Sequence, residues 1–294
     1  MVKGWIIGNG FLSDSEISYQ IGSVIKAASQ SGIDLKLIKN TDILAMYDGD
    51  RISLCGTSEL PEFALFWNKD IRLAYNMEQM GVKLFNNARA IEICDDKALT
   101  HQFLARYGIR MPKTIFPPKT YDNVGYTSFD FLQKVIDELG FPMVIKECSG
   151  SFGFQVYKAD DIFQLRETLK RIGTKPFIFQ EFIGTSAGRD LRIYVVGDHA
   201  VAAGKRSSCN DFRANVVLGG SMEAYKPTDE EAELAIRCSR LLNLDFAGVD
   251  ILWGENDEPI LCEVNSNAHT KKISECTGTN VNKHIIDYIL SKIT

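Results

Sequence analysis

Residues 246–267 read Phe-Ala-Gly-Val-Asp-Ile-Leu-Trp-Gly-Glu-Asn-Asp-Glu-Pro-Ile-Leu-Cys-Glu-Val-Asn-Ser-Asn. Within this stretch, two runs rich in β-forming residues, Val249–Trp253 and Ile260–Val264, flank the turn-forming segment Gly254–Pro259. Short β-forming runs on both sides of such a segment predict a β-hairpin. The rest of the chain can be read outward from this hairpin, because its polar residues fall on one side.

A hairpin that folds symmetrically about its central turn brings three oxygen-bearing side chains together. Asp250 then lies directly opposite Glu263, and Asn265 faces the same side two residues further along its strand. Directly opposite side chains have Cβ atoms roughly 5 Å apart, so the three groups converge on one spot. Hard oxygen ligands that leave room for water and phosphate are typical of a Mg²⁺ site. The alternative is a solvated hairpin face that carries ordinary surface acids.

The composition is that of an ordinary globular protein. The chain has 294 residues, of which 45% are hydrophobic and 24% charged, and its net charge of −5 argues against nucleic acid as the main partner. No apolar run approaches the roughly 18 residues that span a bilayer, and the N-terminal apolar run is too short for a signal peptide. The seven cysteines are widely spaced without a Cys-x-x-Cys pair, which favours reduced thiols. We therefore expect a cytoplasmic protein with no membrane and no nucleic-acid partner.

The first part of the chain alternates between strands and helices. A strand at residues 4–8, a helix at Glu16–Ser29 and a strand at Ile33–Lys39 form a β-α-β unit, which predicts a small parallel sheet. Further elements are expected as a strand at Leu60–Trp67, a helix at Asp70–Met80 and a strand at Val82–Phe85. Residues 1–94 are therefore predicted to form an α/β lobe of their own.

Two lysines and a glycine-bearing turn stand out in the middle of the chain. Lys97 lies in the first turn of a helix that Asp96 begins, where the helix dipole disfavours a cation. A bound anion would explain this lysine, and a plain surface lysine is the alternative. Lys146 ends a strand that leads into the loop Gly150–Gly153. That loop can present backbone N–H groups to phosphate oxygens, although an ordinary hairpin turn would have the same composition.

The remaining predicted strands carry further polar residues. Gln180 and Glu181 interrupt the apolar strand Phe177–Ile183, so one of them faces something polar. Period-two alternation places Asp190 and Arg192 on one face of the next strand. The other candidates and the elements around them are Lys205 after a strand at His199–Gly204, Arg213 and Asn215 on one side of an extended segment, a capped helix from Thr228 to Leu242, and a final helix at Val281–Ile293.

Cations, acids and a glycine-bearing loop together predict a site for a nucleotide and a metal ion. Cations neutralise phosphate oxygens, acids hold the metal ions that bridge phosphates, and a glycine loop covers them. The chain lacks the Gly-x-x-x-x-Gly-Lys-Ser/Thr sequence of P-loop enzymes, and it also lacks the His-Arg-Asp and Asp-Phe-Gly sequences of protein kinases. Both of these nucleotide-binding classes are therefore excluded.

The order of these motifs resembles that of the ATP-grasp ligases, and most closely the RimK-type group of ATP-dependent glutamate ligases and their lysine-biosynthesis relatives. The matching motifs, in chain order, are Asp96-Lys97, Pro142–Lys146, Gly150–Gly153, Gln180–Ile183, Asp190–Arg192, Phe212–Asn215, Val249-Asp250 and Glu263–Asn265. The resemblance covers nearly the whole chain. It implies an α/β (α+β) fold in which a small N-terminal α/β lobe (1–94) precedes a two-lobed ATP-grasp fold, with ATP between two β-sheets. The central lobe is expected at 95–178 and the C-terminal lobe, with the metal site, at 179–294.

The resemblance also implies a role for each matching residue. The expected nucleotide-binding residues are Lys97, Lys146, Gly150, Ser151, Phe152, Gly153, Glu181, Phe182, Ile183 and Asp190, with Lys205 as a further cation. Within this set, Glu181 with the backbone of Phe182 and Ile183 would hold the adenine edge, and Asp190 would take the ribose hydroxyls. The expected catalytic residues are Arg192, Arg213 and Asn215. The two arginines would steady the γ-phosphate and the acyl phosphate, and Asn215 would assist at the phosphate or at the second metal ion. The expected ligands of two Mg²⁺ or Mn²⁺ ions are Asp250, Glu263 and Asn265.

The implied reaction joins a carboxylate to an amine at the expense of ATP. The carboxylate attacks the γ-phosphate, the glycine loop shields the acyl phosphate from water, and an amine displaces phosphate to form an amide. This chemistry requires positioning and charge neutralisation more than a protein nucleophile. The amine would be an amino acid such as glutamate, or a peptide or protein tail, and the resemblance is also compatible with a homo-oligomer.

Two segments depart from the family pattern. Leu218 stands before a Gly-Gly pair where the family carries a basic residue, and Ser266–His269 replaces a stretch that ends in Pro-Gly. Both segments lie where substrates would approach. The resemblance therefore implies the ATP site, but it does not establish glutamate as the amine substrate. His269 either contacts substrate or is a plain loop histidine. The alternatives to a ligase are a small-molecule kinase with the same fold and a nucleotide-binding protein without turnover.

Overall fold

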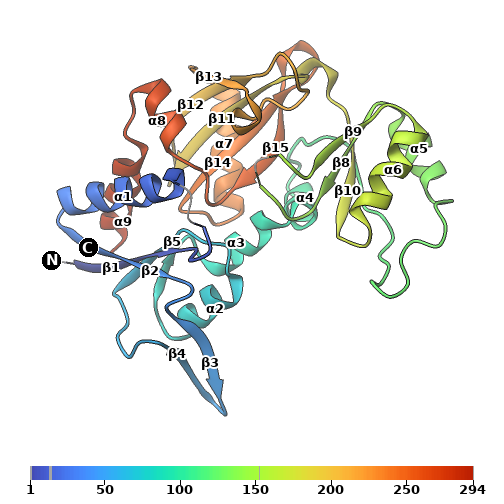
Figure 1. The fold of residues 1–294 in the computed structure, drawn as a ribbon. Coiled ribbons are helices and arrows are strands. Elements are labelled where there is room, and N and C mark those ends of the chain that lie inside the picture. Colours follow the sequence, from blue (N-terminus) through green and yellow to red (C-terminus); the bar gives the residue numbers. More distant parts are fainter. Residues whose placement is uncertain (1, 13–14, 152, 294) are drawn as a thin grey trace.

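The computed structural model describes residues 2–12, 15–151 and 153–293, and it has a mixed α/β architecture with three main sheets (Figure 1). This architecture confirms the predicted fold class. The N-terminal lobe lies at the lower left of Figure 1, a middle lobe projects to the right, and the C-terminal sheet lies above and between them. The three parts meet at the cavity described below.

The N-terminal sheet is parallel, as the β-α-β pattern predicts. Its strands, in the spatial order β2-β1-β5-β6, are β1 (Val2–Gly8), β2 (Ile33–Lys39), β5 (Phe63–Phe66) and β6 (Lys83–Phe85). The helices of this lobe are α1 (Ser15–Gln30), α2 (Ile71–Gln79) and α3 (Ala88–Asp95). Because the strands are parallel, the carboxyl ends of β1 and β5 meet at one edge of the sheet, which is where such sheets bind ligands.

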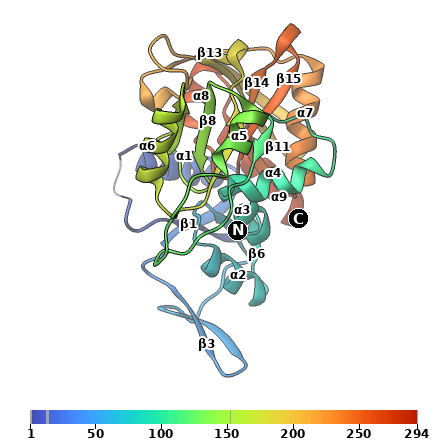
Figure 2. The ribbon, with the colours of Figure 1, turned by 90° about the vertical axis from the view of Figure 1, so that its right-hand side faces the viewer.

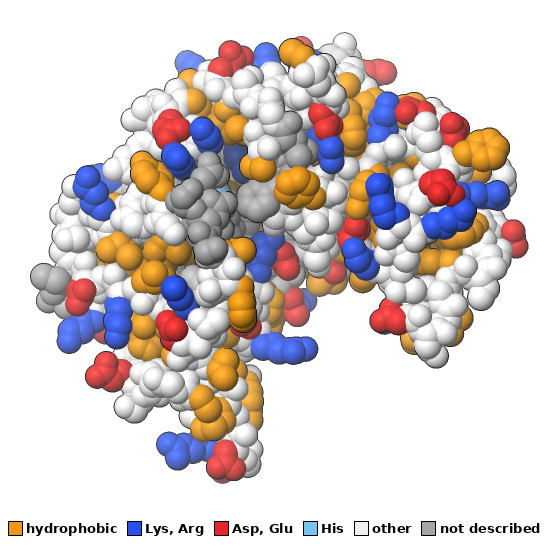
Figure 3. Space-filling view, viewed as in Figure 1, with side chains coloured by type: hydrophobic (Ala, Val, Ile, Leu, Met, Phe, Trp, Pro, Cys, Tyr) orange, Lys and Arg blue, Asp and Glu red, His pale blue; other side chains and the backbone are white. Residues whose placement is uncertain are grey.

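A two-stranded hairpin of β3 (Leu44–Asp48) and β4 (Arg51–Cys55) is absent from the elements predicted from sequence. Its turn contains Gly49 with φ of 62°, a conformation that glycine adopts readily. The hairpin extends away from the lobe (Figure 2), and hydrophobic side chains are visible on its surface (Figure 3). All of β3 is exposed, so the strand lacks the alternation of apolar and polar residues by which a half-buried strand is found in sequence.

The middle lobe is an antiparallel sheet covered by helices. Its strands, in the spatial order β7-β10-β8-β9, are β7 (Thr114–Ile115), β8 (Met143–Glu147), β9 (Val156–Ala159) and β10 (Phe177–Glu181). The helices are α5 (Leu132–Leu139), which begins later than the predicted cap at Ser128, and α6 (Ile162–Ile172). The expected lobe boundary at residue 178 falls inside β10, and the pairing of β10 with β8 places the whole strand in the middle sheet. Helix α4 (Lys97–Ala105) leads from the N-terminal lobe into the middle lobe.

The C-terminal sheet is antiparallel and contains the predicted metal hairpin. Its strands, in the spatial order β13-β12-β11-β14-β15, are β11 (Arg189–Val196), β12 (His199–Ser207), β13 (Ser221–Ala224), β14 (Phe246–Trp253) and β15 (Pro259–Asn265). The helices are α7 (Asp229–Leu241), α8 (Lys271–Thr277) and α9 (Val281–Ile293), and single 3-10 turns lie at Gly184–Ser186, Val216–Leu218 and Glu255–Asp257. The predicted capping box of α7 is confirmed, since Thr228 and Glu231 exchange side-chain-to-backbone hydrogen bonds of 2.7 and 3.2 Å.

One hydrophobic core joins the two ends of the chain. Ile6 and Val24 from the N-terminal lobe are fully buried in the same cluster as Ile285 and Ile289 of α9, and α1 lies beside α9 in Figure 1. Residues of the middle lobe, among them Leu165 of α6, form a cluster of their own. The N-terminal lobe and the C-terminal sheet therefore form one continuous body, to which the middle lobe is attached.

Two further observations bear on the composition arguments. No helix in the part of the chain that the structure describes is long and apolar enough to cross a membrane. All seven cysteines are described, and all are free thiols.

Candidate active site

A cavity of about 870 Å³ is lined by residues from all three parts of the molecule. The predicted site residues that line it are Lys97, Lys146, Gly150, Ser151, Gly153, Glu181, Phe182, Ile183, Asp190, Arg192, Arg213, Asn215, Asp250, Glu263 and Asn265. Phe152 lies outside the described residues, and Lys205 lies elsewhere on the sheet. The N-terminal lobe contributes a wall that was not predicted, which includes Asn9, Trp67 and Lys69.

The predicted hairpin has the expected register next to the cavity. Asp250 pairs with Glu263, and Asn265 follows on the same strand opposite Gly248. Nearer the turn the register shifts by one residue, because Ile251 pairs with Leu261 and leaves Cys262 as an extra residue. The shift is a β-bulge, which re-aims side chains locally. As a result, the consecutive residues Cys262 and Glu263 both line the cavity, which strict alternation would forbid.

A buried cluster of two arginines and two aspartates occupies the cavity face of the C-terminal sheet. Arg192 donates to both oxygens of Asp250 at 2.6 Å. Arg206 donates to both oxygens of Asp190 at 2.5 and 2.7 Å, and its Nη2 also lies 2.9 Å from Asp250 Oδ2. Asp190 and Arg192 are two residues apart on β11. On the neighbouring strands, Arg206 pairs with Asp190 and Asp250 pairs with Arg192, so all four side chains share one face of the sheet.

Arg206 was missed in the sequence analysis, which singled out its neighbour Lys205. Consecutive strand residues face opposite sides, and the structure places Arg206 toward the cavity. Lys205 points to the other side, where its Nζ lies 3.8 Å from Glu223 on β13. The expectation that Lys205 lies at the nucleotide site is therefore corrected, because Arg206 lines the cavity and Lys205 does not. Since β12 continues to Ser207, beyond the predicted end at Gly204, both residues belong to the strand.

Arg192 and Arg206 favour the ionised form of the Asp250 carboxyl group. Burial alone would raise the pKa of this carboxyl, but Arg192 and Arg206 outweigh burial and hold the pKa of Asp250 below its ordinary value. Burial likewise opposes the charge on Arg206, and the nearby Asp190 and Asp250 reverse that effect and raise the pKa of its guanidinium. The two arginines therefore favour the charged form of Asp250 at a buried position, where a charge is tolerated only when it is paired, whereas burial raises the pKa of the neighbouring Asp190.

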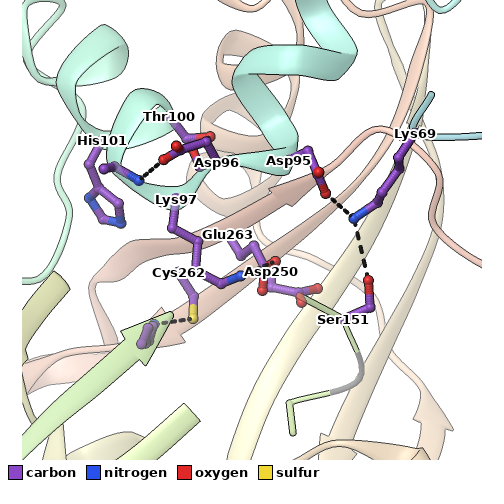
Figure 4. Close-up of polar contacts among 12 residues, drawn as sticks. Lys69, Asp95, Asp96, Lys97, Thr100, His101, Ser151, Asp250, Cys262 and Glu263 are labelled. Atoms are coloured by element: carbon purple, nitrogen blue, oxygen red, sulfur yellow. Dashed lines mark hydrogen bonds and ion pairs between the residues drawn. The ribbon is translucent and has the colours of Figure 1, made fainter. Parts of the chain in front are cut away.

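The two predicted phosphate lysines line the cavity, and Figure 4 shows the side chain of Lys97 pointing toward Glu263. The Asp96 side chain caps α4 by accepting from the backbone N–H groups of Ala98 and Leu99, and this cap orients the first helical turn. Lys97 is only 9% exposed, and its Nζ lies 3.6 Å from Glu263 Oε1. The alternative of a plain surface lysine is therefore wrong.

Lys146 at the end of β8 contacts the bulge residue of the β14–β15 hairpin. Its Nζ lies 3.7 Å from the Sγ atom of Cys262, and the lysine is 8% exposed. Burial raises the pKa of the Cys262 thiol, with Lys146 opposing the rise, so the thiol stays protonated beside the cation. Cys262 thus links the middle sheet to the C-terminal sheet across the cavity, a contact that depends on the bulge.

The glycine loop between β8 and β9 is held by an arginine of the C-terminal part. Gly150 has φ of 141°, and a Cβ atom there would lie 2.5 Å from Gln155 Oε1, so the position requires glycine. Arg213 Nη1 donates to the carbonyl oxygen of Gly153 at 2.6 Å. Asp211 holds the same guanidinium through Nη2 at 2.6 Å. Arg213 therefore positions the loop, in addition to any contact with phosphate.

Comparison with known proteins decides the family. The RimK-like ATP-grasp domain matches residues 94–289. The chain belongs to the RimK-like ATP-grasp family. It is therefore an ATP-grasp ligase that forms carbon–nitrogen bonds.

Individual relatives of this RimK-like ligase agree with the family assignment. The probable alpha-L-glutamate ligase of Aliivibrio fischeri (strain MJ11) is 31% identical over 307 aligned positions, covering 95% of this chain and 94% of the relative. N-acetylaspartylglutamate synthase A of Homo sapiens is 31% identical over 229 positions, covering 76% of this chain and 56% of the relative. The ATP-grasp ligase PsnB, solved with its minimal precursor, Mg and ADP, superposes with a TM-score of 0.71 at 16% identity and covers 99% of this chain and 98% of PsnB. The similarity to PsnB shows the shared fold.

The middle lobe of the RimK-like ligase offers a polar strand end at the predicted adenine position. Glu181 accepts a hydrogen bond of 2.7 Å from the backbone N–H of Lys113, and Phe182 and Ile183 follow it along the cavity. Gln180 is the buried member of the Gln-Glu pair, and its Nε2 contacts His101 Nε2 at 3.1 Å. Burial, with Lys146 and Lys97 nearby, lowers the pKa of His101 to about 3, so its imidazole stays neutral between the two lysines and the strand.

Asn215 and Arg213 reach the cavity from a segment without regular structure. The sequence analysis expected both on one side of an extended segment, but residues 208–215 are irregular, with bends at 209–210 and 212–213. The Asn215 side chain accepts from Val217 N at 2.9 Å and caps the 3-10 turn Val216–Leu218. Gly219 with φ of 96° ends that turn, which identifies one function of the glycine pair after Leu218.

The donor set of the RimK-like ligase fits a hard divalent cation. Within the described ranges, no group of three His, Cys, Asp or Glu side chains could hold a metal ion by itself. Asp250 and Glu263 instead converge with the amide of Asn265, whose buried Nδ2 has no hydrogen-bond partner among described residues. Oxygen donors of this kind suit Mg²⁺ or Mn²⁺. A cation at Asp250 has to share the carboxylate with Arg192 and Arg206.

Proposed function

We propose that this protein is an ATP-dependent carboxylate–amine ligase that activates its acid as an acyl phosphate and releases ADP and Pi. The observation that carries the proposal is one cavity in which carboxylates suited to a metal face cations suited to phosphates. Asp250 and Glu263 line this cavity together with Lys97 and Lys146, and Lys97 Nζ lies 3.6 Å from Glu263. Such an arrangement supports phosphoryl transfer by charge neutralisation and positioning.

Each part of the cavity has a proposed role toward ATP. Glu181 and the backbone of Phe182 and Ile183 would hold the adenine edge, and Asp190 would take the ribose hydroxyls. The phosphate side would be held by Lys97, Lys146, Arg206 and the N–H groups of Gly150–Gly153. Asp250, Glu263 and Asn265 would hold Mg²⁺ or Mn²⁺, with two ions expected. When bound, these ions would neutralise phosphate charge without any proton transfer.

The proposed reaction has two steps. An oxygen of the substrate carboxylate attacks the γ-phosphorus of ATP, the bond to the β-phosphate oxygen breaks, and ADP leaves. The amine nitrogen then attacks the acyl carbon, phosphate leaves, and the nitrogen loses a proton to form the amide. Arg192, Arg213 and Asn215 would steady the transferring phosphoryl group, and the glycine loop would keep water away from the acyl phosphate.

The relatives suggest the class of substrate. The printed names of the Aliivibrio and human relatives refer to glutamate, which supports an amino acid such as glutamate as the amine. The structural neighbour PsnB was solved with a peptide precursor, which supports a peptide or protein tail as an alternative acceptor. The segments at Leu218 and Ser266–His269 differ from the family pattern, and we propose that they select the substrates of this ligase.

A phosphate-release screen tests the proposal. The protein, ATP and Mg²⁺ are mixed with pairs of acids, amino acids and short peptides, and the products are weighed by mass spectrometry. We expect Pi release that requires both partners and a product lighter than their sum by one water. A phosphorylated small molecule without free Pi would instead establish a kinase. ATP binding without turnover across the panel would contradict the proposed reaction for these classes of substrate.

A further inference from the structure

The N-terminal lobe reaches the cavity through the segment that follows β5. Trp67, Asn68 and Lys69 line the cavity at the carboxyl end of this parallel strand. None of them belongs to a motif that the sequence analysis identified. The segment therefore adds a wall whose contribution the proposed reaction does not yet explain.

Asn68 holds this segment rigidly between the two ends of the chain. The residue is 6% exposed, and its side-chain Nδ2 donates to the Gly8 carbonyl at 3.0 Å. Its Oδ1 accepts from the backbone N–H groups of Lys69 at 2.6 Å and Asp70 at 3.2 Å. Its own carbonyl accepts from Asn267 Nδ2 at 2.8 Å, just after the metal hairpin. The backbone from which Lys69 extends is thus tied to both the N-terminal sheet and the C-terminal sheet.

From this base, Lys69 reaches the glycine loop of the middle lobe (Figure 4). Its Nζ donates to Asp95 Oδ1 at 2.5 Å and to the hydroxyl of Ser151 at 3.3 Å. Asp95 ends α3, so it holds the ammonium group from the N-terminal side and aims a further N–H at the loop. Arg213 holds Gly153 from the C-terminal side. The loop is therefore held at two points by cations from the body that the two chain ends form.

We propose that Lys69 is a positioning residue that fastens the glycine loop to the N-terminal lobe while the acyl phosphate exists. The proposal rests on the proposed function, because it assigns the loop its shielding task. Loss of this contact opens the loop more often and admits water, so the acyl phosphate is hydrolysed and Pi forms without amide. A simple surface ion pair between Lys69 and Asp95 would have no such effect, since it leaves the loop untouched.

Hydrogen exchange of the loop tests the contact without any turnover. Exchange of the peptide that spans residues 149–155 is followed by mass spectrometry in the full-length protein with ADP and Mg²⁺. We expect Lys69→Met and Ser151→Ala to speed exchange about two- to fivefold, as the loss of one partly exposed charged hydrogen bond allows. The double variant should exchange no faster than the single ones, because both remove the same contact. Lys175→Met is the matched control, since Lys175 pairs with Glu147 at 3.1 Å in the middle lobe and should leave the loop unchanged.

The ratio of Pi to amide tests the consequence. We expect a ratio near one for the wild type and for Lys175→Met, and a ratio raised about two- to fivefold in Lys69→Met and Ser151→Ala. Wild-type exchange or a wild-type ratio in either variant overturns the role of Lys69, and so does a double variant whose effect is the product of the two single effects. If the wild type forms no amide with any substrate pair, the proposed function fails and the exchange result alone decides the role of Lys69.

Discussion

The cavity has two charged regions that are built in opposite ways. In the cluster of Asp190, Arg192, Arg206 and Asp250, the side chains of Arg206 and Asp250 are only 7% and 6% exposed. In the contact between Lys69, Asp95 and Ser151, the side chains of Lys69 and Asp95 are 37% and 26% exposed. Removing one partner of a buried ion pair strongly destabilises the folded protein, whereas an exposed ion pair contributes little to stability. The C-terminal wall of the cavity is therefore rigid, and the loop wall is adjustable.

The comparison predicts that Arg206 has the largest effect on stability. Arg206→Met leaves Asp190 without its bidentate partner and Asp250 with one arginine, so we expect the free energy of unfolding to fall by about 3–5 kcal/mol. Urea denaturation measures this change. Arg240→Met is the matched control, because Arg240 pairs with Asp198 on the surface at 2.9 Å and should change stability by about 0–1 kcal/mol. Equal effects of the two variants on the free energy of unfolding would show that burial does not strengthen these ion pairs, which contradicts the argument for a rigid C-terminal wall.

Asp250 is expected to have the next largest effect, on turnover. Asp250→Asn keeps the shape of the side chain and removes the charge that a metal ion requires, so kcat should fall by about 10²–10³. The rate of Pi release measures this fall. Asp257→Asn serves as the control, since this exposed carboxylate in the hairpin turn pairs with Arg189 at 3.5 Å, away from the cluster. Normal turnover in Asp250→Asn would show that the cluster has a structural role alone.

Arg192 sharpens the comparison because it competes with a metal ion for the same carboxylate. Both oxygens of Asp250 accept from Arg192, so Arg192→Met should raise the affinity for Mn²⁺ alone about tenfold, well within the repulsion between a guanidinium and a dication a few ångströms apart. The same variant should bind ATP more weakly. Titration of Mn²⁺ by electron paramagnetic resonance measures the first effect. Arg213→Met should leave Mn²⁺ affinity unchanged, because Arg213 pairs with Asp211 and the glycine loop.

The smallest expected effect comes from a buried acid that lacks an arginine. Asp245 immediately precedes β14, and its Oδ1 accepts from the Tyr288 hydroxyl at 3.0 Å. Burial raises the pKa of Asp245 to about 6, against an ordinary value of 3.8. Between about pH 4 and pH 6 the folded protein keeps a proton that the unfolded chain has lost, so this group lowers stability as pH rises through that window.

Asp245→Asn removes this pH-dependent loss. We expect the variant to be about 1–2 kcal/mol more stable than the wild type at pH 7, after allowance for partial exposure, and nearly equal to it at pH 4. Tyr288→Phe should act in the other direction above pH 6, because the hydroxyl favours the charged carboxylate. Thermal unfolding across pH 4–7 measures both. An unchanged difference between wild type and Asp245→Asn at pH 4 and pH 7 would contradict the assignment.

Local rules of strand geometry explain what could be predicted from sequence. The alternation along β11 and the symmetry of the hairpin place Asp190, Arg192 and Asp250 on one face and set Asp250 opposite Glu263, as the register shows. The capping residues of α4 and α7 were also found, because caps depend on neighbours in sequence. These features require knowledge of a few consecutive residues only.

Features that depend on the ends of strands or on distant contacts could not be predicted. The bulge at Cys262 separates two registers of one hairpin, because Trp253 pairs with Pro259 next to the turn whereas Asp250 pairs with Glu263 further along. The choice between Lys205 and Arg206 depends on where β12 ends. The wall at Lys69 depends on contacts with Ser151, which lies 82 residues away. The periodic pattern of apolar and polar residues along the sequence predicts none of these three features.

The hydrophobic core that α9 completes also affects the order in which parts of the protein can fold during synthesis. A ribosome delivers Ile6 and Val24 long before Ile285 and Ile289, and these residues are buried against one another. The apolar surface of α1 therefore stays uncovered while most of the chain is being synthesised, whereas the middle lobe, with its own core, can fold as it emerges. The side of the first lobe that α1 covers is thus completed only when α9 emerges, whereas the other side has a core of its own, which includes Ile7, Phe66 and Met77.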